Sequence, residues 1–253
     1  MDPNDTLLPS SLTRLSIDYT TFEWLPNLEN LENLAELRLN LCAKLKAIQG
    51  VGRLKALQTL EISSLRCLNS LDGLVDLMSS CNYKLTNLII WRCPLLITAL
   101  DEYCRSESAL PRLKVLQIGG VLRFSNDSSG TTMLEGLENL TELVELVLVN
   151  LPSVQRLPSL SKLRALQRLI VWDIPNLREI EGLEGLKSLK KLQVGAYTSL
   201  ERLAIADLPS GMEWLTLDLR GCTNFTTDLS TLKLQWSTGK IRWPDRNLFL
   251  GFY

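Results

Sequence analysis

Leucines and other apolar residues recur along nearly the whole chain in the six-residue pattern L-x-x-L-x-L. Copies begin at Leu12, Leu34, Leu57, Leu85, Leu113, Leu143, Leu166, Leu189 and Trp214, and a truncated copy begins at Leu229. The first eight steps between copies are 22, 23, 28, 28, 30, 23, 23 and 25 residues. In most copies a cysteine or another apolar residue follows three positions after the last leucine. A regular period of this length indicates a chain built by repeating one small structural unit.

This pattern and period are those of the leucine-rich repeat, in which each unit is one strand followed by a return segment. A single unit cannot bury its apolar face, so the units must stack around a shared core. The sequence therefore predicts an α/β right-handed solenoid with one parallel, concave sheet of about nine to ten strands. We expect the convex side to be irregular or to contain short helices.

Alternation of inward and outward residues around each pair of leucines predicts a short strand in every copy. In the copy that begins at Leu166, Ile174, Leu177 and Ile180 should then turn into the core, and Leu183 and Leu186 should close the convex side. We expect the strands at residues 14–18, 36–40, 59–63, 87–91, 115–119, 145–149, 168–172, 191–195 and 216–220.

Two copies are longer than the rest. The fourth contains the extra segment 101–110 (DEYCRSESAL), and the fifth contains 123–132 (RFSNDSSGTT), which is polar and rich in turn-forming residues. Insertions in solenoids emerge as loops, either away from the stacked strands or at their rim. We expect two such loops, which are either solvated connections or additional binding sites.

The two ends of the chain differ. We assign residues 1–235 to the leucine-rich-repeat domain, while 236–253 leave the repeat pattern. This last segment contains Trp243, Phe249 and Phe252, which could cover the open end of the core as a C-terminal cap. The chain enters the repeat pattern by Leu12 without a comparable segment, so we expect it to be the C-terminal part of a longer protein.

The cysteines are most simply interpreted as core residues. There are six of them, none in a C-x-x-C motif, and the chain has no histidine, which excludes a zinc site of the usual kind. Three share one repeat position, and even the nearest two lie roughly 10 Å apart, beyond the reach of a disulfide. We expect free thiols and a reducing, cytoplasmic location, with access to the nucleus also compatible. The three that share a position are Cys42, Cys93 and Cys222.

The composition argues against catalysis and against several classes of partner. Without histidine, the usual Ser-His-Asp, Cys-His and H-E-x-x-H sites are excluded. The segment 182–188 (GLEGLKS) lacks the spacing of a phosphate-binding loop, so we predict no cofactor and no enzyme activity. A net charge of −1 gives no general attraction to nucleic acid or to a membrane. No apolar run approaches the length of roughly 18 residues that a membrane span needs.

The outward positions of the middle strands are unusually apolar. Polar residues occupy both ends of the concave face, including Asp218 and Arg220 in the ninth copy, and Gly119 with Gly120 should leave a shallow notch. Exposed aromatic and aliphatic residues ringed by charge are typical of the centre of a protein interface. We predict a protein-binding patch, covered either by an external partner, by another domain of the same polypeptide or by the inserted loops. Its residues are Ile89, Trp91, Arg92, Val147, Val149, Arg168, Ile170, Trp172 and Asp173.

The extended repeat resembles that of plant intracellular immune receptors, the nucleotide-binding leucine-rich-repeat proteins. The similarity covers about residues 12–235 and is carried by phrases such as LAELRLNLCAKLKAI, LTNLIIWRCPLL and LDLRGCTNF. These phrases are most similar to TIR-class members of the flax rust resistance type. Plant extracellular repeats instead favour asparagine followed by L-x-G-x-I-P at the position where this chain has Cys42, Leu65, Cys93, Leu151, Ile174 and Cys222.

The resemblance implies a role in disease resistance. The repeats would recognise a pathogen effector, directly or through a guarded host protein, and hold the receptor inactive until then. The family's TIR and nucleotide-binding domains are not in this sequence, so their activities do not belong to these residues. The alternative is a free-standing leucine-rich-repeat scaffold or adaptor that assembles signalling or ubiquitin-ligase components. A nucleotide-binding domain upstream in the parent transcript would favour the receptor, and an F-box would favour the adaptor.

Overall fold

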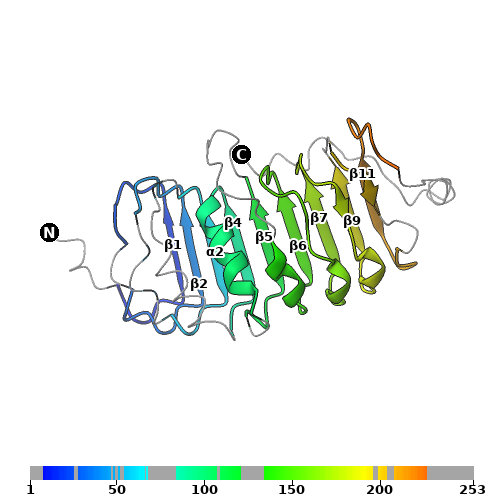
Figure 1. The fold of residues 1–253 in the computed structure, drawn as a ribbon. Helices are drawn as coiled ribbons and strands as arrows, with labels where there is room; N and C mark the ends of the chain where they lie inside the picture. The colour runs from blue at the N-terminus through cyan, green and yellow to red at the C-terminus, as the bar shows by residue number, and fades with distance from the viewer. Residues whose placement is uncertain are drawn as a thin grey trace.

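In the described part of the chain, nine short parallel strands form one sheet. The computed structural model describes residues 8–25, 28–46, 48, 51, 54–65, 67, 84–106, 109–120, 134–195, 199–203 and 208–226. Strands succeed one another in chain order, with each paired to its neighbours (Figure 1). They are β1 (Arg14–Asp18), β2 (Glu36–Asn40), β3 (Thr59–Ser63), β4 (Asn87–Trp91), β5 (Val115–Gly119), β6 (Glu145–Val149), β7 (Arg168–Trp172), β9 (Lys191–Gly195) and β11 (Trp214–Asp218).

The inward side chains of these strands form continuous apolar rows. The register places Leu37 beside Leu60 and Leu146 beside Leu169, and all four side chains are buried. Each unit therefore buries its leucines against those of its neighbours, as the repeat requires. All predicted strands except the last begin and end at the predicted residues, and the leucine-rich-repeat solenoid is confirmed.

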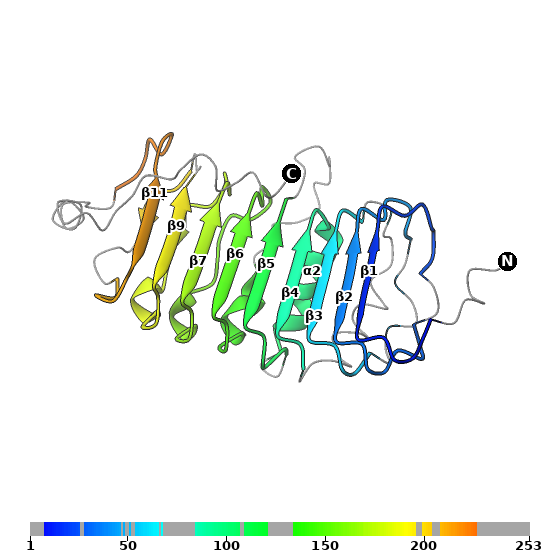
Figure 2. The same ribbon diagram turned by 180° about the vertical axis from the view of Figure 1, so that it is seen from behind.

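A second layer of short elements covers the inner side of the sheet. It consists of a helix, several single-turn helices and a two-stranded parallel sheet, and Figures 1 and 2 show the helical segments on one side of the strands only. The return segment of the seventh unit packs as expected, because Ile174, Leu177, Ile180, Leu183 and Leu186 are all buried. The elements are α2 (Pro94–Cys104), η3 (Glu135–Asn139), η4 (Leu160–Lys162), η5 (Leu183–Gly185), β8 (Glu179–Ile180) and β10 (Arg202–Leu203).

The first part of the insertion in the fourth unit, 101–104, is the last turn of a helix rather than the expected loop. α2 begins at Pro94, where a missing N–H is harmless, and ends at Cys104. The side chain of Asp101 is 7% exposed, and its Oδ1 accepts a hydrogen bond from the backbone N–H of Gly136 at 3.0 Å. Asn139 Nδ2 donates to the carbonyl oxygen of Cys104 at 3.0 Å, so η3 of the next unit holds the end of α2. The other expected loop, 123–132, lies outside the described residues.

The last predicted strand is displaced by two residues. β11 covers Trp214–Asp218 instead of 216–220, and Leu215 and Leu217 stand beside Leu192 and Val194 of β9. The sequence alternates Leu215, Leu217 and Leu219, so a shift of two residues leaves apolar side chains facing inward in both registers. Pairing with β9 selects the earlier register.

The two extra residues are taken up before the turn that ends the ninth strand. In earlier units a residue with positive φ stands two positions after the second inward side chain, as at Leu41 (φ 54°) and Arg92 (φ 56°). In the ninth unit Gly221 (φ 90°) takes this role, four positions after Leu217. Cys222 therefore follows its turn as Cys42 and Cys93 follow theirs, although it is only partly buried.

The five cysteines in the described part of the chain are free thiols. Cys42 Sγ donates to the carbonyl oxygen of Ile17 at 3.4 Å, and the backbone N–H of Leu65 donates to Cys93 Sγ at 3.5 Å. These two buried thiols thus link the second unit to the first and the fourth unit to the third.

The expected tenth strand and the C-terminal cap, with Trp243, Phe249 and Phe252, lie outside the described residues. In the described part of the chain, no helix is long and apolar enough to cross a membrane.

Candidate protein-binding surface

One face of the nine-stranded sheet points away from the leucine core and is seen directly in Figure 2. It is the face predicted from the sequence to be concave, and it is hereafter the outer face. Each strand presents three outward residues, which form three columns across the sheet. The predicted patch lies on β4 to β7, in the second and third columns and at the strand ends. The second column contains Ile89, Gln117, Val147, Ile170 and Gln193, and the third contains Trp91, Gly119, Val149, Trp172 and Gly195.

Two members of the predicted patch are not exposed. Val147 is 4% exposed and Ile170 is 7% exposed, although both point away from the core. They stand side by side in the register of β6 and β7, where Gln117 and Gln193 flank them on the next strands. Adjacent apolar side chains on a sheet cover one another. The expectation that Val147 and Ile170 face solvent is therefore wrong, and they form the floor of the patch.

Both tryptophans of the third column lie against a glycine of the following strand. A Cβ atom on Gly119 would be 2.5 Å from Trp91 Cζ3, and one on Gly195 would be 2.6 Å from Trp172 Cζ3. The space left by each missing side chain is thus filled by an indole ring. The prediction of a notch at Gly119 and Gly120 is therefore wrong, because the Trp91 ring occupies the space beside both glycines.

The two indoles form a repeated arrangement. From β4 to β11 the third column reads Trp91, Gly119, Val149, Trp172, Gly195 and Asp218, so each tryptophan is followed by a glycine. Both rings lie toward the following strand, and the two tryptophans are three strands apart, about 14 Å. Both remain partly exposed. Since the glycines fix where the rings lie, these aromatic surfaces are largely pre-formed.

Arg168 lies at the rim of the patch as predicted, but its charge is paired. Its Nη1 donates to Glu145 Oε2 at 3.0 Å, and Gln117 Nε2 donates to Glu145 Oε1 at 2.7 Å. This network ties β5, β6 and β7 together. Sequence reasoning missed Glu145 because it followed only two outward columns. The signal was available, since Glu145 stands two positions before Val147 and so shares its face.

The turn residues at the rim are shaped by the adjacent strands. Arg92 Cγ would be 3.0 Å from a Cβ atom on Gly120, so the Arg92 side chain covers that glycine. Asp173 has a positive φ (53°), and its backbone N–H donates to the carbonyl oxygen of Gly195 at 3.0 Å. Both side chains are partly exposed beside the tryptophans that precede them.

The N-terminal half of the outer face is polar. Arg14 Nε lies 3.4 Å from Glu36 Oε2, and Arg38 contacts both Glu36 and Glu61 across β2 and β3. Both arginine side chains are well exposed and the glutamates are partly buried, so these ion pairs contribute little to stability. They do give this half a balanced charge that contrasts with the apolar patch.

The C-terminal end of the outer face is also polar, but its charge is more buried. The side chain of Asp218 is 5% exposed, and Arg220 Nε donates to its Oδ1 at 2.8 Å. The hydrogen bond from Arg220 holds the pKa of the Asp218 carboxyl below its ordinary value. The sequence pattern assigned Asp218 and Arg220 to the second and third columns of this unit. The observed pairing with β9 places Thr216 and Asp218 in these columns instead.

The most exposed aromatic side chains lie elsewhere, after β1. Tyr19, Phe22 and Trp24 are 77%, 58% and 42% exposed, and they are the large apolar residues that stand out in solvent among those described. Sequence reasoning did not single them out. The described residues contain no group of histidine, cysteine or acidic side chains suited to hold a metal ion.

No protein-family model matches the chain. Three solved structures are similar over most of its length. An internalin from Listeria monocytogenes is 16% identical, with 93% of this chain and 87% of that chain covered and a TM-score of 0.43. The internalin C2 of the same species is 17% identical, with coverages of 81% and 80% and a TM-score of 0.40. The leucine-rich-repeat domain of the type III effector XopL is 21% identical, with coverages of 82% and 69% and a TM-score of 0.46.

The sequence period and the in-register parallel sheet give this chain the fold of a leucine-rich-repeat solenoid.

Proposed function

We propose that this chain is a protein-recognition domain that binds its partner on the outer face from β4 to β9. The observation that carries the proposal is the pair of indoles, Trp91 and Trp172, held in place by Gly119 and Gly195. Rigid, partly exposed aromatic side chains lose little conformational entropy on binding. Tryptophan and arginine are also the residues that most often dominate the energy of protein interfaces.

The surroundings of the two indoles support this choice of site. Val147 and Ile170 form a buried apolar floor between them, and Ile89, Val149, Arg92 and Asp173 extend the surface. A partner of standard size covers roughly 800 Å² on each side, which is enough to span two points about 14 Å apart. The paired charges of β1 to β3 and of Asp218 with Arg220 would form a polar rim.

We further propose that the domain belongs to a plant disease-resistance receptor. The repeat phrases that resemble the TIR-class receptors support this assignment, and the partner would then be a pathogen effector or a guarded host protein. A second role of the same surface is autoinhibition, in which it contacts another domain of the parent receptor until the effector arrives. No catalytic role is proposed for these residues.

The experiment places Trp91→Ala and Trp172→Ala separately in the full-length parent protein. Arg38→Ala, on the polar half of the outer face, is the matched control, and Gln193→Ala tests the boundary of the patch because it adjoins Ile170. Effector binding and effector-independent cell death are measured for each variant. We expect the tryptophan variants to lose binding or to activate the receptor without effector, with little effect of Arg38→Ala.

If all variants are folded and behave like the unmodified receptor, the outer face is not the recognition site. The segments 101–110 and 123–132 would then be the next candidates. If the unmodified parent protein binds no effector, and the tryptophan variants instead disrupt an assembly of signalling or ubiquitin-ligase components, the adaptor role replaces the receptor role.

A further inference from the structure

β1 is an edge of the nine-stranded sheet, and in the described part of the chain it pairs only with β2. The N–H of Tyr19 donates to Asn40, and the carbonyl oxygen of Thr13 accepts from Ala35 and Glu36. Backbone groups alternate along a strand, so those of Arg14, Ser16 and Asp18 point away from β2. These three residues offer donors and acceptors to a further strand.

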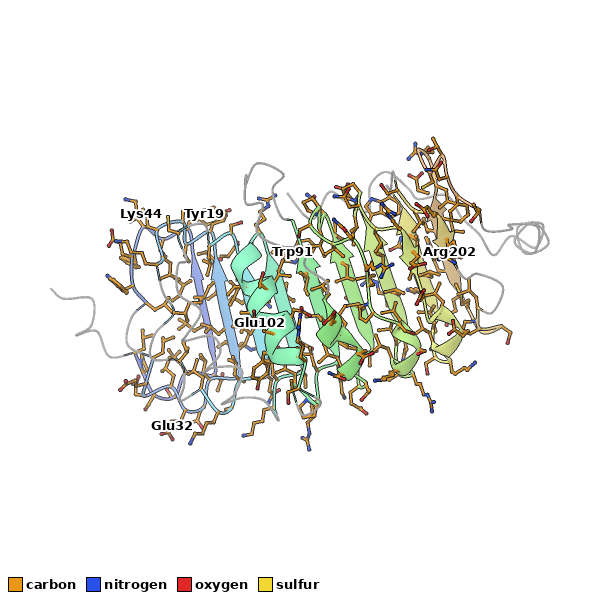
Figure 3. The ribbon with its side chains drawn as sticks, in the orientation of Figure 1. Tyr19, Glu32, Lys44, Trp91, Glu102 and Arg202 are labelled. Carbon is orange, nitrogen blue, oxygen red and sulfur yellow. The ribbon has the colours of Figure 1, made fainter. Side chains whose placement is uncertain are left out.

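The same end of the solenoid carries both partly buried and exposed apolar side chains. Leu12, Leu15 and Ile17 pack against the core but are only partly buried, whereas their counterparts in the second unit are fully buried. Tyr19, at the end of β1 in Figure 3, begins the exposed aromatic segment that includes Phe22 and Trp24. An edge strand of this kind is a template for pairing with another chain.

We propose that this edge binds a second copy of the same chain, with the two β1 strands antiparallel about a two-fold axis through Ser16. That axis stands perpendicular to the sheet, so the two outer faces become continuous and the two cores lie on the same side. Arg14, Ser16 and Asp18 can then all exchange backbone hydrogen bonds with the other copy. The proposal is independent of partner recognition by β4 to β9.

The sequence of β1, RLSID, is self-complementary in this arrangement. Arg14 of one copy stands opposite Asp18 of the other, and Leu15 stands opposite Ile17 on the core side. Arg14 and Asp18 are both exposed on the outer face. Within the chain Arg14 lies 3.4 Å from Glu36, and Asp18 accepts a hydrogen bond from Ser16 Oγ at 2.8 Å. Because Arg14 is 82% exposed, its side chain can also reach Asp18 of the second copy. Opposite charges directly across a strand pair are favourable, and like charges are unfavourable.

The flanking residues extend the contact. In the same register Tyr19 stands beside the segment around Thr13 of the second copy, next to the partly buried Leu12. Burial of Tyr19 and its neighbouring aromatic residues would remove apolar surface from water.

The test measures the molar mass of the 253-residue chain over a range of concentrations by analytical ultracentrifugation. We expect a reversible dimer for the unmodified chain, weakened by added salt. Arg14→Asp and Asp18→Arg should each be monomeric, since each places like charges opposite one another. An equimolar mixture of these two variants should restore a dimer, and so should the double variant R14D/D18R.

Lys191→Asp, an exposed charge reversal on the outer face of β9, is the matched control and should dimerise like the unmodified chain. Circular dichroism confirms that each variant is folded. A monomeric unmodified chain would overturn the proposal. It would also be overturned by single variants that still dimerise, or by a mixture of the two that does not associate.

Discussion

The indole of Trp172 packs so closely against Gly195 of the neighbouring strand that no side chain fits between them. A Cβ atom on Gly195 would stand 2.6 Å from Cζ3 and 2.8 Å from Cη2 of the ring. Because the glycine backbone has no positive φ there, the restriction is purely steric. The contact therefore sets where the aromatic surface of the patch lies, and it can be tested separately from binding.

Gly195→Ala should destabilise the domain by about 1–3 kcal/mol, because the new methyl group overpacks the Trp172 ring and Asp218 Cβ. In a chain that already carries Trp172→Ala, the same Gly195→Ala change should cost less free energy of unfolding, since two of the three close contacts are then absent. Chemical unfolding of the single and double variants measures both effects.

Two other glycines serve as controls. Gly211→Ala should be nearly neutral, because no atom lies within 4 Å of its added Cβ. Gly119→Ala should not be rescued by Trp91→Ala, because its Cβ would also clash with the backbone oxygen of Val149. Equal rescue at both tryptophan sites would show that the steric account of Gly119 is wrong.

Most of the fold could be predicted from the sequence because one simple rule, inward leucines with a regular period, determines it. The rule placed β1 to β9 of the main sheet at their observed residues. It failed at β11 because Leu215, Leu217 and Leu219 satisfy it in two registers. It also gave a loop at Asp101–Cys104, where Pro94 and the spacing of Leu96 and Leu100 were available signals of a helix.

The candidate site was less predictable than the fold. Alternation shows which face a side chain occupies, but it does not show how much its neighbours cover it. Val147 and Ile170 are buried because apolar residues happen to stand side by side across two strands. Tyr19 is exposed because its unit lies at the end of the sheet, a consequence of stacking rather than of its own repeat.

Leu169→Ala should cost roughly 2–5 kcal/mol of unfolding free energy, because this side chain is fully buried in the leucine row. Leu12→Ala should cost clearly less, since Leu12 is only partly buried at the edge of the sheet. Denaturant unfolding of both variants gives the comparison. Similar losses for both would argue against a continuous row of buried leucines.

The cysteines should differ sharply in reactivity in the folded protein. Burial raises the pKa of the Cys93 thiol to about 11 and that of Cys104 to about 12, so neither forms the reactive thiolate near neutral pH. Among the five cysteines that the structure describes, Cys67 is exposed and should react first with a thiol reagent. In denaturant, all six cysteines should react without prior reduction. Mass spectrometry of the labelled sites counts them, and fewer than six free thiols would contradict the prediction that all six cysteines are free.

The same thiols should make the domain less stable in alkali. Their pKa values are higher in the folded than in the unfolded chain, so folding favours the protonated form. This contribution is fully present below the unfolded value of 9.0 and is lost as pH rises toward the folded values of about 11 and 12. Across this pH range, the unfolding free energy of the double variant Cys93→Ala/Cys104→Ala should fall less steeply than that of the unmodified chain. An unchanged slope would assign the alkaline loss to other groups.

The affinity of the domain for its partner is the most direct test of recognition by the outer face. Calorimetric titration would compare the unmodified chain with Trp91→Ala, Trp172→Ala and the control Arg38→Ala, after unfolding curves confirm that all are folded. We predict that each tryptophan variant weakens binding by about 2 kcal/mol or more, roughly 30-fold in Kd, while Arg38→Ala binds nearly normally. Equal affinities for all four proteins would contradict the account, because a partner bound across β4 to β9 must contact at least one of these indoles.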